Sequence, residues 1–160
     1  MEFKDWAELA RWVVPLLVLI LGWSVVSRGN DRRETRKEIR QFIDRTIVSV
    51  ENIRNNTIEC LTQADGPKSK RLELSIDPEL LQMEKSLSLL NLKCAGKAVD
   101  GRALRQAVSD NGVYRVANRD KLSMDHRVLA NINLNAAELI ASLEEAYRDT
   151  YQKERFFRIG

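Results

Sequence analysis

The sequence is poor in the residues that form tight turns, disulfides and metal sites: it has seven glycines, three prolines, two cysteines and one histidine in 160 residues. Scarce Gly and Pro argue against β-sandwiches and barrels, which need many tight turns. So few Cys and His cannot supply a disulfide framework or a four-ligand zinc site. With 31% charged and 44% hydrophobic residues, neither general disorder nor a multi-span membrane protein is expected.

One apolar segment stands out near the N-terminus. Trp12–Ser27 runs for 16 residues without a charge, which is about 24 Å of helix against a hydrocarbon core of about 30 Å. Apolar residues upstream and snorkelling arginines at both ends can make up the shortfall. A cleaved signal peptide, a buried core helix and an interfacial helix fit the pattern less well. The sequence therefore predicts an anchor in residues 1–28, with a transmembrane helix over about 10–27.

Basic residues around this segment predict its orientation. Seven Lys and Arg lie in residues 28–45, whereas two lie in residues 1–11, so the N-terminus is expected outside and residues 29–160 in the cytoplasm. Tryptophans flank the run as an interfacial belt would, at Trp6, Trp12 and Trp23. The residues expected to fix topology and meet anionic headgroups are Arg28, Arg32, Arg33, Arg36, Lys37 and Arg40.

The remaining chain has the periodicity of helices. Residues 31–61 carry a seam of period 3.5 from Ile39 to Cys60, wide enough to favour a bundle over a two-stranded coiled coil. Gly29-Asn30 is interpreted as a break before this helix. A second helix is expected from Asp77-Pro78 to a cap at Gly96. Residues 71–76 alternate as a short strand would, but they have no evident partner strand and are interpreted as the extended or helical lead-in to this helix.

A short helix over about 100–110 and a long one from about Ser123 follow, joined by a loop over 113–122. The predicted fold is all-α: a single N-terminal transmembrane helix followed by a cytoplasmic bundle of three long helices and one short one.

Motifs for catalysis, nucleotides and metals are missing. There is no phosphate-binding loop, nucleophile elbow, Cys-x-x-Cys or His-Glu-x-x-His, and His126 sits among charged neighbours. Cys60 and Cys94 fall on predicted core seams, where small buried hydrophobes are more common than a redox pair. We expect no enzyme, no cofactor and no bound metal.

The C-terminal tail carries aromatics between cations, at Arg155, Phe156, Phe157 and Arg158. They either cover the open end of the bundle or form a docking segment for a partner or the membrane surface. The interleaved acids of residues 32–38 and the lack of a stacking platform argue against nucleic acid.

The expected function is that of a bacterial-style single-pass inner-membrane scaffold, sensor or adaptor that meets membrane lipids and acts through a protein partner or self-association. No small-molecule substrate is evident. The alternative is a membrane-active effector of the toxin or defence type, whose span oligomerises and permeabilises the bilayer; the absence of intramembrane charge and of Gly-x-x-x-Gly favours the first.

Overall fold

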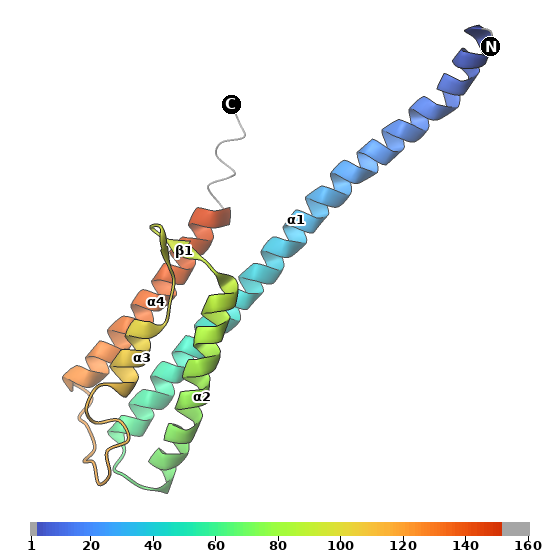
Figure 1. Ribbon diagram of the computed structural model, residues 1–160. Coiled ribbons are helices and arrows are strands. Elements are labelled where there is room, and N and C mark those ends of the chain that lie inside the picture. The colour runs from blue at the N-terminus through green and yellow to red at the C-terminus, as the bar shows by residue number, and fades with distance from the viewer. Residues whose placement is uncertain (1–2, 152–160) are drawn as a thin grey trace. The chain divides into compact units, whose positions relative to one another are not determined.

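The computed structural model describes the backbone of residues 3–151 and the side chains of residues 13–20, 22–23, 26–27, 30 and 33–151. The predicted all-α class is confirmed, because nearly all regular structure in this range is helical (Figure 1). The elements are α1 (Phe3–Thr62), α2 (Pro67–Leu90), β1 (Lys93–Cys94), β2 (Lys97–Ala98), α3 (Arg102–Ser109) and α4 (Arg127–Tyr151).

The described chain divides between Ile39 and Arg40 into two compact units. The first is the N-terminal part of α1, on which the large apolar side chains described between Val13 and Val26 are exposed. The second contains the rest of α1 and all the other elements. It is a helical bundle, as predicted; the predicted boundary after residue 28 stays a prediction.

The predicted transmembrane helix gains no support here. Within the described part of the chain, residues 3–151, no helix is both long and apolar enough to cross a membrane.

The predicted break at Gly29-Asn30 is wrong, since α1 continues as a helix through both residues. A glycine inside a helix costs only about 1 kcal/mol, and the helix-forming Arg and Glu residues that follow offset part of it. Proline, which removes a backbone donor, lies elsewhere in α1, at Pro15.

The start of the second helix was misplaced by eleven residues, since its first helical residue was predicted at Pro78. α2 begins at Pro67, where Gly66 and Ser69 form a capping box: the Gly66 N–H donates to Ser69 Oγ and the Ser69 hydroxyl donates to the Gly66 carbonyl, both at 3.0 Å. Residues 71–76 are helical and not a strand, and Pro78 lies inside the helix.

α2 also ends earlier than predicted. Asn91 adopts a left-handed conformation and donates its N–H to the Leu87 carbonyl, which closes the helix before Gly96. Gly96 serves instead in the turn of a small hairpin, where Ala95 and Gly96 both have positive φ (49° and 80°) between β1 and β2. Cys94 therefore lies on a strand, half-buried, and not on a helical core seam.

The core of the second unit follows the predicted seams closely. Asn56 of α1 donates to the Glu79 carboxylate of α2, and Arg40 of α1 donates to Glu144 of α4, so both helices lie along the C-terminal part of α1 (Figure 1). α3 packs against α4. The buried seam residues are Ile43, Thr46, Val50, Ile53, Thr57 and Cys60 on α1, Ile76, Leu80, Met83 and Leu87 on α2, Leu104, Ala107 and Val108 on α3, and Leu129, Ile132, Ala136, Leu139, Leu143 and Ala146 on α4.

Candidate functional site

The loop between α3 and α4 folds onto the α1–α2 turn and brings a buried cation with it. The Leu122 N–H donates to the Leu61 carbonyl (3.0 Å), and the Asn118 N–H donates to Asp65 Oδ2 (2.9 Å). Asn118 itself has φ of 56°, in the left-handed region that asparagine tolerates better than most residues. The loop is thereby fixed in a conformation that turns Arg119 into the bundle.

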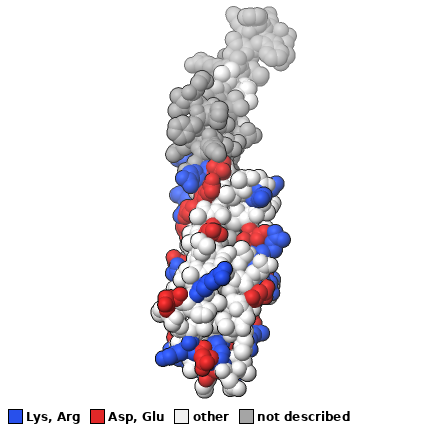
Figure 2. Space-filling view, turned by 90° about the vertical axis from the view of Figure 1, so that its left-hand side faces the viewer, with Lys and Arg blue, Asp and Glu red and all other residues white. Residues whose placement is uncertain are grey.

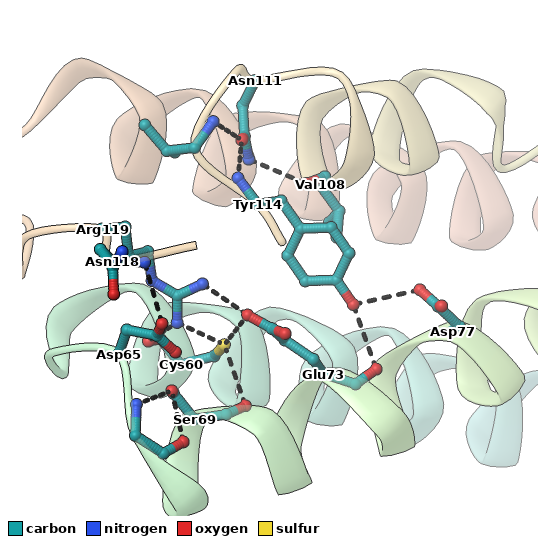
Figure 3. A network of polar contacts seen from close by, with 12 residues as sticks. Cys60, Asp65, Ser69, Glu73, Asp77, Val108, Asn111, Tyr114, Asn118 and Arg119 are labelled. Atoms are coloured by element: carbon teal, nitrogen blue, oxygen red, sulfur yellow. Dashed lines mark hydrogen bonds and ion pairs between the residues drawn. The ribbon is translucent and has the colours of Figure 1, made fainter. Parts of the chain in front are cut away.

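Arg119 is the centre of this polar cluster, and 3% of its side chain is exposed (Figure 3). Its Nη1 donates to Glu73 Oε1 at 2.5 Å, and its Nη2 lies 2.7 Å from the Cys60 carbonyl and 3.1 Å from Cys60 Sγ. Its Nε is buried without a partner. A buried guanidinium is tolerated only when it is paired, so Glu73 and Cys60 hold the charge inside the fold.

Cys60 is fully buried beside this ion pair. Its Sγ lies 3.6 Å from the Ser69 carbonyl and 3.9 Å from Glu73 Oε1. Burial raises the pKa of the Cys60 thiol, with a smaller contribution from Glu73, and these effects outweigh the opposing effect of Arg119. The thiol therefore stays protonated at neutral pH and is a poor nucleophile.

Tyr114 joins the same loop to α2. Its hydroxyl lies 3.2 Å from the Glu73 carbonyl and 3.1 Å from Asp77 Oδ1 (Figure 3). Asp77 also pairs with Arg115. Burial and the neighbouring Asp77 charge raise the pKa of Tyr114, so the phenol remains a neutral donor. Tyr114 and Arg119 together tie the loop to α1 and α2, so the cluster fixes the loop against the bundle.

A second polar cluster joins α1 to α4 around Arg40. The guanidinium contacts both Glu144 carboxylate oxygens (2.7 and 2.8 Å), pairs with Asp44 at 2.9 Å and lies 5.5 Å from the centre of the Tyr147 ring. The hydrogen bond from Arg40 lowers the pKa of Glu144. Arg40, predicted at the membrane surface, is thus engaged by the bundle.

The other residues predicted at the membrane surface are described only in part. Arg33 and Lys37 are exposed and Arg36 is half-buried. Trp23 is 77% exposed. The side chains of Arg28, Arg32, Trp6 and Trp12, and the whole tail segment with Arg155, Phe156, Phe157 and Arg158, lie outside the described residues.

Side chains that could bind a metal ion do not cluster in the described part of the chain. There, no group of three or more His, Cys, Asp or Glu side chains is placed to hold a metal ion. His126 is exposed, and its Nδ1 accepts the Val128 N–H at 3.2 Å. Cys94 Sγ lies 3.3 Å from Glu145 Oε2, a hydrogen bond that, with some burial, raises the pKa of the Cys94 thiol.

A surface hollow of about 290 Å³ lies between the hairpin, α3 and α4. Its lining combines charged and apolar residues, among them Lys97, Asp100, Glu138 and Leu139. On the face shown in Figure 2, acidic and basic side chains are interspersed with uncharged surface, without a continuous basic area of the kind that nucleic acids require.

The buried cluster was missed by sequence reasoning. Residues 113–122 have no apolar period, so nothing marked Tyr114 or Arg119 as inward-facing, and Glu73 was assigned to the lead-in of α2. One indication only came from the sequence: residues 113–122, although without a period, were expected to form a structured loop.

Comparison with known proteins provides no further guide to the site. The chain matches no protein-family model, no curated protein and no solved structure.

Proposed function

We propose that this protein is a single-pass membrane-anchored adaptor: the apolar segment of α1 holds it in a bacterial inner membrane, and the helical bundle binds a protein partner or a second copy on the cytoplasmic side. The observation that carries the proposal is the exposure of consecutive apolar side chains along α1. Leu16, Leu17 and Leu19 are 59%, 52% and 71% exposed, and Trp23 is 77% exposed. Successive residues of a helix point 100° apart, so this apolar surface surrounds the helix.

Such a surface is unfavourable in water at about 25 cal/mol per Å² of apolar area. It needs a cover, and lipid is the environment in which a helix that is apolar on every side is stable. The charge-free run is short for a span, so the proposal includes local thinning of the bilayer and snorkelling of the flanking arginines.

The orientation rests on the bias of seven Lys and Arg in residues 28–45 against two in residues 1–11. The exposed Arg33 and Lys37 lie within about 15 Å of helix from Arg28, so they are close enough to anionic headgroups to contact them. The well-packed bundle then presents its helical faces to the cytoplasm, and its function is binding rather than catalysis.

The experiment is membrane fractionation of the full chain expressed in a bacterium, followed by extraction with alkaline carbonate. We expect the chain to stay in the membrane pellet, and Leu17→Arg with Leu19→Arg to release it. The matched control, Met124→Arg with Leu134→Arg, places the same charges on exposed bundle positions and should leave the chain in the membrane. A chain that fractionates as soluble, or a control pair that releases it equally, contradicts the anchor.

Two further measurements test orientation and mode of action. Alkaline phosphatase fused after Gly160 should be inactive, whereas a fluorescent protein at the same place should fluoresce. The full chain reconstituted into vesicles that contain carboxyfluorescein should not release the dye. Release that disappears with Leu17→Arg and Leu19→Arg would identify the alternative, a membrane-permeabilising effector.

A further inference from the structure

α2 separates its charges between two sides. All four of its acidic side chains contact residues from other elements: Glu73 binds Arg119, Asp77 binds Tyr114 and Arg115, Glu79 binds Asn56 and Glu84 binds Arg105. Three cations lie on the opposite, outward side, at Lys70, Arg71 and Lys85. They make no ion pair within the described residues, although ion-pairing residues are frequent elsewhere in the bundle.

Exposed apolar residues lie between these cations. Leu74, Leu81 and Leu89 are 73%, 49% and 78% exposed, and the exposed Pro78 lies between the first two. Leu74, Pro78, Leu81 and Lys85 follow one another at steps of 4, 3 and 4, the same spacing as the buried seam on the inner side of α2. The outer side of α2, from Lys70 to Leu89, thus has a second helix-packing seam about 29 Å long, and no acidic residue lies on it.

We infer that this outer side of α2 is the docking surface of an acidic amphipathic helix from a partner protein, and the inference rests on the adaptor role proposed above. Leu74 and Leu81, which are seven residues apart, fit a partner helix that carries its own leucines at the same spacing. Cations that flank such a seam and lack acids select a partner with Glu or Asp beside its leucines.

Charge decides against a second copy as the occupant. Two outer sides of α2 packed together would bring six cations into one interface without an acid to balance them. Like charges packed against one another repel, so such an interface would be unfavourable. An anionic membrane would also attract the cations. However, the apolar part of the outer side of α2 is only one leucine wide and lacks the Trp and Phe that are common on interfacial helices, so a membrane is the less suitable occupant.

The test uses the full chain in non-ionic detergent and two fluorescent synthetic peptides of about three heptads, which match the length of the seam. Both peptides carry Leu at positions a and d; one carries Glu at e and g, and the other Lys. Fluorescence anisotropy should show that the Glu peptide binds about tenfold more tightly than the Lys peptide, the effect expected of three partly screened ion pairs.

Three variants make the result specific to the outer side of α2. Reversing its cations together (Lys70→Glu, Arg71→Glu, Lys85→Glu) should invert the preference, so that the Lys peptide binds more tightly. Replacing Leu74 and Leu81 with Ser should weaken the binding of both peptides while lowering Tm only slightly, because the two leucines are 73% and 49% exposed. The matched control reverses three exposed cations elsewhere, Arg45→Glu, Lys121→Glu and Arg127→Glu, and should leave the preference unchanged.

Failure is recognisable and independent of the anchor, because the assay uses the purified full chain whether or not it fractionates with membranes. A Glu peptide that does not bind, or that is weakened equally by the control reversal, overturns the inference. So does a reversal on the outer side of α2 that changes only the binding of the chain to phosphatidylglycerol vesicles, since lipid would then be the occupant.

Discussion

Replacing Arg119 with methionine removes the one cation that holds the Glu73 carboxylate and the Cys60 carbonyl inside the bundle. The Arg119 side chain is 3% exposed and that of Glu73 15%, so water cannot readily replace the lost donors. Removing one partner of a buried ion pair costs about 3–5 kcal/mol, because the other charge is left uncompensated. At roughly 4 °C per kcal/mol for a chain of this size, Tm should fall by about 12–20 °C.

A double variant and a control variant test whether the loss of stability comes from an unpaired buried charge. Arg119→Met together with Glu73→Leu removes both charges and leaves apolar side chains, so the double variant should be more stable than Arg119→Met alone. The control is Arg102→Met, which breaks an ion pair with Asp100 in which the side chains are 81% and 42% exposed. That loss should be below about 1 kcal/mol.

The assay is unfolding followed by circular dichroism at 222 nm, with the full chain in non-ionic detergent. If Arg119→Met and Arg102→Met lowered Tm equally, Arg119 would not be paired in a buried site. If the double variant were less stable than Arg119→Met, the energetic coupling between Arg119 and Glu73 would be refuted.

Further predictions concern pH, thiol reactivity and the core. The pKa of Glu144 is lowered by Arg40, so its stabilising contribution is fully present above the unfolded pKa of about 4.3 and is lost as the pH falls through the lower folded pKa. Chemical denaturation should therefore show that the destabilising effect of Glu144→Gln shrinks as the pH falls below about 4.3. Cys60 is fully buried and Cys94 half-buried, so Ellman's reagent at pH 8 should label Cys94 in the native chain and both thiols only in guanidinium, whereas early labelling of Cys60 would contradict its burial. Leu139 is 6% exposed in the bundle core, so Leu139→Asp should cost several kcal/mol, on the order of 3–5, and a variant that melts like the parent would refute the seam assignment.

The helical class and the core seams could be predicted from the sequence, because both depend on local repetition. A helix places residues three and four apart on one side, so the apolar steps of 3 and 4 along α1 and α4 identified buried residues such as Ile53 and Leu139 before their partners were known. The short helix α3 was found in the same way from Leu104, Ala107 and Val108.

Helix ends were predicted less well, because their signals are short and compete with one another. Asp77-Pro78 has the sequence of a helix start, but Gly66, Pro67 and Ser69 supply a second start eleven residues earlier. Starting there extends the helix by eleven residues and buries Ile76 and Ser69, so packing favours the earlier start.

The polar cluster around Arg119 could not be predicted from the sequence and depends on the tertiary structure alone. Arg119 lies 46 residues from Glu73 and 59 from Cys60, and no periodic pattern connects positions that far apart. The charge sorting on α2 has the same origin: its acids and cations are mixed along the sequence, and only the contacts of the folded bundle show which side is paired. Local chemistry thus determined which residues form helices and which apolar residues are buried, whereas long-range contacts determined where each buried charge finds its partner, since a charge is stable in the core only when the fold brings an opposite one to it.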